Sequence, residues 1–329
     1  MNIENPEELI KKIDKRIAEL EAKEKGKDNP KEESLENETT AKVMEMIETI
    51  KAENLEISLQ KLNNLIGLTE VKEEVNKLTN YLKFCKRIKG KSSLDRLNLN
   101  MIFKGSPGTG KTTVARIIAG ILYNLGYLES KAFIETTPRD FIGEYIGHTS
   151  IKSKKLIDKY KGGVIFVDEA YGFVHEEGEY NFADEAIVEI IKEMETKETV
   201  FIFSGYPKDM DRFIELNSGI KSRVGYHIDF KDYTEEELSE IFKFKLTKSN
   251  FQITEDAYEN IKNIIKIKKQ EKNFGNGRMI DNLYDEVLLE HASLNYDNKN
   301  ESELLIMKNE SVGVVMTRAQ QKQRRGYFE

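Results

Sequence analysis

Residues 105–112 read GSPGTGKT and match the pattern G-x-x-x-x-G-K-[ST]. An apolar segment, 99–104, precedes them, and a segment with helical periodicity, 111–125, follows. Glycines in such a loop let backbone N–H groups wrap around a phosphate, and the N-terminus of the next helix attracts negative charge. Lys111 would reach the β- and γ-phosphates, and Thr112 would ligate Mg²⁺. The residues expected to bind a nucleotide here are Gly105, Pro107, Gly108, Thr109, Gly110, Lys111, Thr112 and Thr113.

A second apolar segment, 164–167, ends in two adjacent carboxylates, Asp168 and Glu169. Unpaired charge is costly to bury, so this pair at the end of a core strand indicates a function. Beside a phosphate loop, Asp168 would hold Mg²⁺ through the water shell of the metal, and Glu169 would orient and deprotonate the attacking water. A small-molecule kinase has no use for such a base. The pair therefore favours hydrolysis of ATP to ADP and phosphate.

Short apolar segments alternate with helical ones through the middle of the chain. The expected strands are 99–104, 132–136, 164–167, 200–204 and 227–230, and the expected helices are 111–125, 149–161, 183–197 and 207–216. This alternation predicts an α/β fold with a parallel, doubly wound sheet that is covered on both faces. No strand is expected after Tyr233. Thr234 and Glu237 form the pattern of a capping box, and helical periodicity continues beyond it.

These patterns divide the chain into four parts. Residues 1–58 are expected to form a charged helical arm, with a mobile linker at 24–40. Residues 59–232 form the α/β domain, residues 233–297 a small all-helical domain, and residues 298–329 a C-terminal tail. The arm is either a solvated extension or an element for docking or assembly.

Composition narrows the class of protein. The chain has 329 residues, and no apolar run reaches the ~18 residues that span a bilayer. Its start lacks the apolar core of a secretory signal, and the single cysteine, Cys85, cannot form an internal disulfide, which together favour the cytoplasm. Net charge is −7, and the arm contributes most of it, with 16 acidic and 10 basic residues in 1–60. Only the final segment is basic, so the body of the chain lacks the excess of Lys and Arg that is typical of a domain that binds duplex nucleic acid.

Several stretches together resemble one family. They are LIGLTEVKEEV (65–75), MIFKGSPGTGKTTVARIIAGIL (101–122), DFIGEYIGHTS (140–150), GGVIFVDEAY (162–171), GIKSRVGYHIDF (219–230) and FGNGRMIDNL (274–283). With them the chain resembles the AAA+ ATPases, and within these the CbbX/SpoVK group, which includes red-type rubisco activases and stage V sporulation proteins. The resemblance implies a P-loop NTPase with a helical lid, ATP and Mg²⁺ as cofactors, and a homo-hexameric ring.

The resemblance also implies roles for single residues. Ile66 and Gly67 match the segment that lies against adenine. Arg223 matches the arginine finger, which such proteins insert into the site of the neighbouring subunit, and its permanent charge and forked donors suit phosphate oxygens. Arg278 matches sensor 2, which reaches from the lid to the γ-phosphate. Each of the two arginines, without the motif set, would be an ordinary surface or salt-bridge arginine.

The sensor 1 position is less regular. The usual asparagine at the end of the fourth strand is not evident in residues 201–206, FIFSGY. The group resembles Ala-Gly-Tyr there, so Ser204 departs from its pattern. The candidates are Tyr206, or Ser204 acting through a water molecule.

Tyr145, Ile146 and Gly147 match the aromatic–aliphatic–glycine loop that lines the ring's central pore in the family and grips a threaded peptide. An aromatic face offers contact that does not depend on the client's sequence. Without the family, Tyr145 would be an ordinary half-buried loop residue.

The expected function is therefore that of an ATP-driven ring that remodels or threads a protein client. One alternative is a DNA-directed AAA+ motor or loader, against which the absence of a basic domain weighs. Another is a nucleotide-gated scaffold without hydrolysis, against which the intact Glu169 weighs. Within the favoured class, rubisco activation and a sporulation or other remodelling role are not separated by these motifs.

Overall fold

Five parallel strands form the central sheet in the order β2-β3-β4-β1-β5. Their bounds are β1 Met101–Gly105, β2 Phe133–Thr136, β3 Val164–Val167, β4 Val200–Gly205 and β5 Tyr226–Phe230. β1 lies between β4 and β5, with Met101 opposite Ile202 on one side and Tyr226 on the other. The predicted parallel sheet is confirmed. The carboxyl ends of β1, β3 and β4 share one edge, where ligands bind in open α/β sheets.

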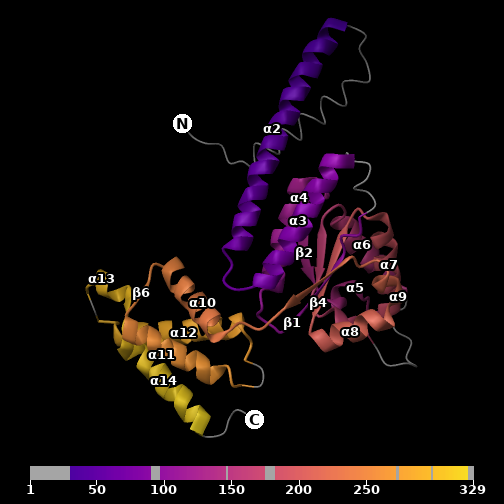
Figure 1. The fold of residues 1–329 in the computed structure, drawn as a ribbon. Coiled ribbons are helices and arrows are strands. Elements are labelled where there is room, and N and C mark those ends of the chain that lie inside the picture. The colour runs from indigo at the N-terminus through magenta and orange to yellow at the C-terminus, as the bar shows by residue number, and fades with distance from the viewer. Residues whose placement is uncertain are drawn as a thin grey trace. The chain divides into compact units, whose positions relative to one another are not determined.

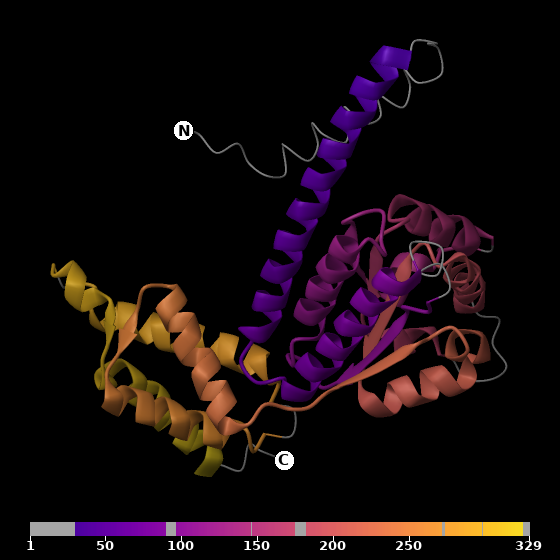
Figure 2. The same ribbon diagram turned by 45° about the horizontal axis from the view of Figure 1, so that its top comes forward.

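Helices cover both faces of this sheet, as Figures 1 and 2 show. One face carries α3 (Thr69–Lys89) and α4 (Lys111–Leu125). The other carries the short 3₁₀ helix η3 together with α5 to α9, and their bounds are α5 Pro138–Phe141, α6 His148–Lys159, η3 Ala170–Phe173, α7 Phe182–Thr196, α8 Pro207–Leu216 and α9 Ser218–Lys221. Because both faces are covered, the strands are almost continuously apolar rather than alternating.

Phenylalanine side chains fill much of the core on the two sides of the sheet. Phe103 packs against Phe230 on one side, with ring centroids 5.0 Å apart. On the other, Phe203 packs against Phe213 of α8 at 5.5 Å. All four are buried. The core therefore anchors β1 and β4, the two central strands whose ends reach the ligand-binding edge.

The C-terminal part of the chain is mainly helical. Its elements are α10 Glu235–Lys248, β6 Gln252–Ile253, α11 Glu255–Lys268, α12 Gly277–Leu294, α13 Glu301–Leu304, β7 Ile306–Met307 and α14 Asn309–Arg324. The predicted capping box is present, because the Glu237 N–H donates to Thr234 Oγ1 at 3.1 Å and the Thr234 N–H donates to Glu237 Oε2 at 2.8 Å.

Two expectations for this region are wrong. Strands do occur after Tyr233, since β6 and β7 form a short parallel pair. Of the expected tail, residues 299–324 are not separate, because α14 packs against α11 and α12 and buries Val312, Val315 and Ala319. Two-residue strands and a helix with few apolar residues leave almost no periodic signal in the sequence.

The structure is a computed structural model that describes residues 30–89, 97–145, 147–174, 182–271, 274–297 and 299–324. The chain separates into two units, Met1–Ile57 and Ser58–Glu329. Helix α2, Pro30–Asn63, accounts for the described part of the first unit. The linker expected at 24–40 is therefore helical from Pro30 onward. Proline is tolerated at a helix start, and residues 31–63 contain neither glycine nor proline to stop the helix.

No helix among these described residues is long and apolar enough to cross a membrane. The cytoplasmic location stays a prediction, as does the helical arm over residues 1–29, which lie outside the described part.

Candidate active site

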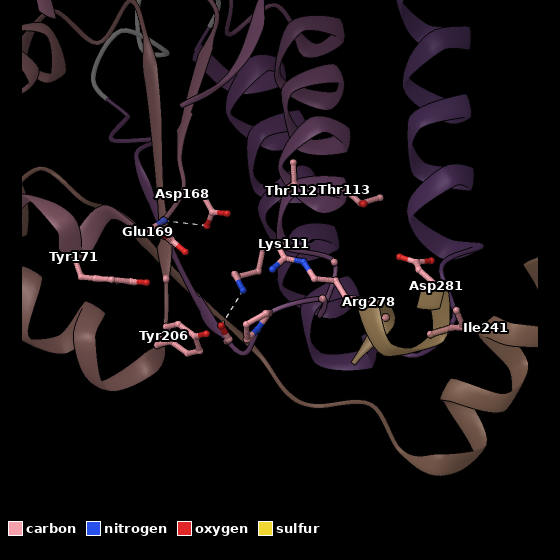
Figure 3. A pocket seen from close by; sticks show the side chains of 16 residues that line it. Lys111, Thr112, Thr113, Asp168, Glu169, Tyr171, Tyr206, Ile241, Arg278 and Asp281 are labelled. Carbon is pink, nitrogen blue, oxygen red and sulfur yellow. Dashed lines mark hydrogen bonds between the residues drawn. The ribbon is translucent and has the colours of Figure 1, made fainter. Parts of the chain in front are cut away.

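A cavity of about 320 Å³ opens at the carboxyl edge of the sheet (Figure 3). It brings together the phosphate loop, the end of β3, the end of β4 and the start of α12. Its lining residues are Gly105, Pro107, Gly108, Gly110, Lys111, Thr112, Thr113, Asp168, Glu169, Tyr171, Gly205, Tyr206, Ile241, Gly277, Arg278 and Asp281. Most of the residues predicted to bind ATP thus converge on one cavity. Thr109 is fully buried behind the loop, and its hydroxyl donates to Ser106 O at 2.8 Å.

The phosphate loop depends on glycine at two positions. Gly108 and Gly110 have φ of +73° and +90°, a region that L-residues rarely adopt. A Cβ on Gly108 would lie 2.2 Å from the carbonyl oxygen of Gly275, so a side chain does not fit there. The loop can therefore close tightly against the start of α12.

Lys111 lies across this loop. Its Nζ donates to the carbonyl oxygen of Gly105 at 2.8 Å (Figure 3). It also donates to the carbonyl oxygen of Ser106 at 2.8 Å. Burial lowers the pKa of Lys111, while the charge of Asp168 opposes the shift and the charge of Arg278 adds to it. Phosphate oxygens would replace the two carbonyl acceptors and supply the negative charge that this ammonium lacks.

Asp168 and Glu169 lie at the end of β3. Asp168 Oδ1 accepts hydrogen bonds from the Ser204 hydroxyl at 3.0 Å and from the Glu169 N–H at 3.1 Å. Glu169 has a φ of +51°, a strained conformation for a residue with a Cβ. Such strain is retained where the surrounding structure enforces it, and it is common at catalytic sites.

The structure changes the view of the sensor 1 position. Ser204 is fully buried, and its hydroxyl donates to Asp168 Oδ1, so it orients this carboxylate. The sensor 1 role of Tyr206, or of Ser204 through a water molecule, stays a prediction. Tyr206 lines the cavity but is 42% exposed, with its ring centroid 6.1 Å from that of Tyr171. Burial, aided by Glu169, raises the pKa of Tyr171 to about 12, so this phenol is a neutral hydrogen-bond donor at pH 7.

A second, largely apolar cavity of about 670 Å³ adjoins the first, sharing Gly108, Thr113, Ile241 and Gly277 with it. Ile66 lines it, as do Ile117 of α4 and Phe244 of α10. Gly67 has a φ of +63°, which favours glycine, and a Cβ there would lie 2.4 Å from Glu237 Oε1, so that side chain would have to shift. An apolar cavity next to the phosphate loop suits the flat base of a nucleotide.

The backbone at Ile66 is fixed by Lys72, whose Nζ donates to Leu65 O at 2.5 Å. Tyr233 closes the wall of the second cavity, and its hydroxyl donates to Thr109 O at 3.3 Å. Burial raises the pKa of Tyr233 to about 12, so it remains a donor.

The start of α12 is bonded to the phosphate loop itself. The Gly277 N–H donates to Gly108 O at 3.0 Å. Asn276, which is buried and has a φ of +49°, accepts from the Tyr233 N–H at 2.9 Å and donates to Asp232 Oδ1 at 2.8 Å. Sequence reasoning missed Asn276, because these partners are more than 40 residues away and no local pattern marks them.

Arg223 is not among the residues that line this cavity. Its guanidinium forms an ion pair with Glu195 and donates to Gly219 O at 2.9 Å. Arg278, from the first turn of α12, does line the cavity and extends toward Lys111 in Figure 3.

Tyr145 lies on the loop before α6 and is 65% exposed. Its ring contacts His148 edge-on, with centroids 5.4 Å apart, above a hollow that is also lined by Ile151, Lys152 and Lys155. Gly147 caps α6 with a φ of +78°. Ile146 lies outside the described residues.

The donor set fits Mg²⁺. Thr112 and Asp168 line the same cavity and offer a hydroxyl and a carboxylate, the oxygen ligands that this ion prefers. Among the described residues, no group of three or more His, Cys, Asp or Glu side chains could hold a metal on its own.

Two family models match the chain. The ATPase family associated with various cellular activities (AAA) matches residues 101–231, and the AAA lid domain matches residues 234–312.

Three curated relatives show how far the similarity extends. The CfxQ homologue of Galdieria sulphuraria is 37% identical, over 82% of this chain and 89% of the relative. The chloroplastic ribulose bisphosphate carboxylase/oxygenase activase of Cyanidioschyzon merolae is 40% identical, over 70% and 79%. Stage V sporulation protein K of Bacillus subtilis is 34% identical, over 78% and 81%.

Among solved structures, the FIGL-1 AAA domain in complex with ADP has a TM-score of 0.54 at 15% identity, with 78% of this chain and 82% of that chain covered. At this identity the likeness concerns the fold.

Proposed function

The chain belongs to the AAA+ ATPases, in the group of CfxQ, CbbX and stage V sporulation protein K, and from this premise we propose that it is a ring-forming motor that remodels a protein client. As a member of this family it hydrolyses ATP. The observation that carries the proposal is Tyr145, an exposed aromatic side chain outside the nucleotide cavity, on a loop that ends in a left-handed glycine.

In the proposed mechanism, the phosphate loop and Lys111 hold the β- and γ-phosphates, with Arg278 at the lid side of the same cavity. Glu169 takes a proton from the attacking water. Mg²⁺, held by Thr112 and through water by Asp168, would neutralise charge that develops on the phosphate oxygens. The Ser204 hydroxyl keeps one oxygen of Asp168 oriented by its 3.0 Å hydrogen bond.

The proposed assembly is a homo-hexamer in which Arg223 completes the ATP site of the neighbouring subunit. Two features support this role. Arg223 is outside the cavity of its own chain, and its side chain is 30% exposed. A permanently charged, forked guanidinium stabilises charge on a transferring phosphoryl group, and arginines supplied by a neighbour are a recurrent device for this.

In the proposed action on the client, Tyr145 contacts the polypeptide and moves with the nucleotide state of its subunit. Tyr145 lines a hollow together with a basic and an aliphatic side chain, Lys155 and Ile151. An aromatic surface of this kind binds side chains with little dependence on their sequence. One relative is named as a ribulose bisphosphate carboxylase/oxygenase activase and another as a sporulation protein, so the client proposed here is a protein whose identity must come from experiment.

A site-specific cross-link tests the proposal. The photoreactive residue p-benzoylphenylalanine would replace Tyr145 in a Glu169→Gln ring, which should hold ATP without hydrolysing it. After illumination in an extract of the source cells, the ring in the presence of ATP should form protease-sensitive adducts. The same ring in the presence of ADP should form far fewer. The matched control places the same group at Tyr296, which is 88% exposed but lies on the turn after α12.

Two results would contradict protein remodelling. Equal adducts from both positions would show that position 145 is merely exposed. Nuclease-sensitive adducts at position 145 would favour the DNA-directed motor instead.

A further inference from the structure

The side chain of Asn100 connects the central strand β1 to the backbone of Arg223. Asn100 immediately precedes β1 and is only 3% exposed. Its Nδ2 donates to Arg223 O at 3.0 Å, across 123 positions of sequence. Its Oδ1 accepts from the Phe201 N–H of β4 at 2.8 Å.

The partners define how the amide is oriented. The backbone N–H of Phe201 needs an acceptor, and the backbone C=O of Arg223 needs a donor. The Oδ1 and Nδ2 of Asn100 therefore cannot change places. The second hydrogen of Nδ2 points to Asn98 Oδ1 at 3.1 Å. Every polar group of this buried side chain is therefore paired, and no other residue of similar size offers one acceptor and two donors in this arrangement.

The backbone of Asn100 strengthens the same connection. Its carbonyl oxygen accepts from the Gly225 N–H at 2.9 Å, two residues after Arg223. Gly225 has no room for a side chain, since a Cβ would lie 2.1 Å from Asn98 O. The segment that carries Arg223 is thus bound to the start of β1 at the carbonyl of the arginine itself and again two residues after it.

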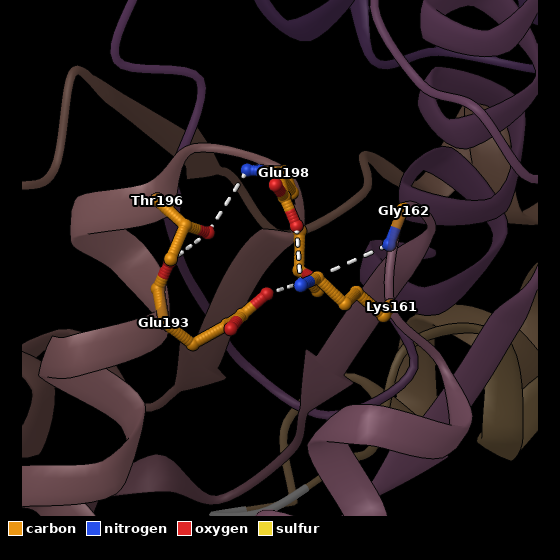
Figure 4. Close-up of polar contacts among 6 residues, drawn as sticks. Lys161, Gly162, Glu193, Thr196 and Glu198 are labelled. Carbon is orange, nitrogen blue, oxygen red and sulfur yellow. Dashed lines mark hydrogen bonds and ion pairs between the residues drawn. The ribbon is translucent and has the colours of Figure 1, made fainter.

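The guanidinium has a separate support. It pairs with Glu195 in the last turn of α7. That turn is joined to the sheet by a polar network (Figure 4), in which the Thr199 hydroxyl donates to Glu193 Oε1 at 2.6 Å and accepts from the Gly162 N–H at 3.3 Å. Glu195 is itself 58% exposed. Arg223 can therefore leave Glu195 to bind a phosphate, because the carboxylate left behind stays in contact with water. The buried Asn100 contact has no such alternative.

We propose that Asn100 is a positioning residue for the arginine that completes the neighbouring subunit's ATP site. The inference rests on the proposed role of Arg223 in trans. β1 runs from Asn100 at one end to the phosphate loop at the other. The same strand therefore carries the subunit's own phosphate loop and holds the finger that it presents to its neighbour.

Mixed rings test this inference. Lys111→Ala subunits keep Arg223 and donate it, while Arg223→Ala subunits keep an intact phosphate site and accept it. Mixing the two should restore ATPase activity. Adding Asn100→Ala to the donating Lys111→Ala subunit should then reduce the restored rate by about 10–100-fold, as expected when a catalytic group is displaced by about 1 Å. Adding Asn100→Ala to the accepting subunit should cost far less.

Asn124 supplies the matched control. It is a buried asparagine, 8% exposed, and it lies on helix α4 rather than at the start of a strand. Asn124→Ala in the donating subunit should leave most of the restored activity. Melting temperature and binding of a fluorescent ATP analogue are measured for every variant. If Asn100→Ala does not fold, Asn100→Asp replaces it, because it keeps the acceptor for the Phe201 N–H and loses the amide donors to Arg223 O and Asn98 Oδ1.

Two results would overturn the inference. An equal loss from Asn100→Ala in either subunit would show a general structural role. A failure of the parent mixture to recover, with mixed rings verified, would instead refute Arg223 as a finger in trans, and the inference with it.

Discussion

Replacing Ser204 by alanine isolates one hydrogen bond of the catalytic edge. The hydroxyl is fully buried and donates to Asp168 Oδ1 at 3.0 Å. Removing it deletes a single oxygen atom, so it creates no clash, and the backbone of Ser204 stays paired opposite Phe103 in the sheet. Asp168 then keeps its bond from the Glu169 N–H but is free to rotate away from the position that suits the metal.

The size of the effect follows from the charge of the acceptor. A hydrogen bond to a charged group contributes about 1.5–3 kcal/mol. At about 1.4 kcal/mol per tenfold change, Ser204→Ala should lower kcat/KM by roughly 10–150-fold if the bond orients Asp168 in the transition state. The concentration of Mg²⁺ needed for half-maximal ATPase should rise as well, whereas binding of ATP without the metal should change little.

A matched control separates this role from loss of stability. Ser153 is also fully buried, and its hydroxyl donates to Phe141 O at 3.0 Å, away from the cavity. Ser153→Ala should lower the melting temperature about as much as Ser204→Ala and leave the Mg²⁺ dependence unchanged. The reasoning fails if Ser204→Ala hydrolyses ATP normally across a Mg²⁺ titration, or if both variants lose activity equally.

Three further changes give distinct outcomes. Glu169→Gln keeps the shape of the site but removes the base, so turnover should fall by roughly 10²–10⁴-fold in a phosphate-release assay while ATP binding persists; near-normal turnover would exclude Glu169 as the base. Tyr145→Ala should leave the thermal melt nearly unchanged, since the side chain is 65% exposed, and should reduce the client retained on an ATP-trapped ring, whereas Tyr145→Phe should be mild; a loss near the ~3–5 kcal/mol of a core aromatic would show instead that Tyr145 is packed. Gly277→Ala would place a Cβ 2.7 Å from a phosphate-loop carbonyl, so it should destabilise the fold by about 1–3 kcal/mol in denaturant titrations and weaken nucleotide binding; wild-type values for both would mean that the start of α12 moves away freely.

The sequence predicted what is encoded locally. The segment 164–167 was expected as a strand and is β3, and 111–125 was expected as a helix and is α4, because apolar runs and periodic helices carry their own signal. The parallel sheet and the meeting of the phosphate loop with Asp168 followed from the same patterns. The helix from Pro30 was missed because charge and a lack of large apolar residues resemble a linker as much as a solvated helix.

Contacts between distant residues could not be predicted in this way. Ser204 reaches Asp168 across 36 positions, and Asn100 reaches Arg223 across 123. A polar side chain has no periodicity that identifies its partner, and only the order of the strands brings these pairs together. The packing of α14 onto the lid has the same origin, since this helix is largely polar and its burial depends on α11 and α12.

The hydrogen bond from the Gly277 N–H to Gly108 O makes the lid, in thermodynamic terms, a ligand of the phosphate loop. Linkage then requires reciprocity, so the factor by which a bound nucleotide strengthens or weakens this contact is the factor by which the contact changes nucleotide affinity. Helix α14 packs on α12, which begins at Gly277. A molecule that binds α14 and favours one lid position would therefore change the affinity for ATP without touching the cavity, and ATP would change the affinity for that molecule by an equal factor.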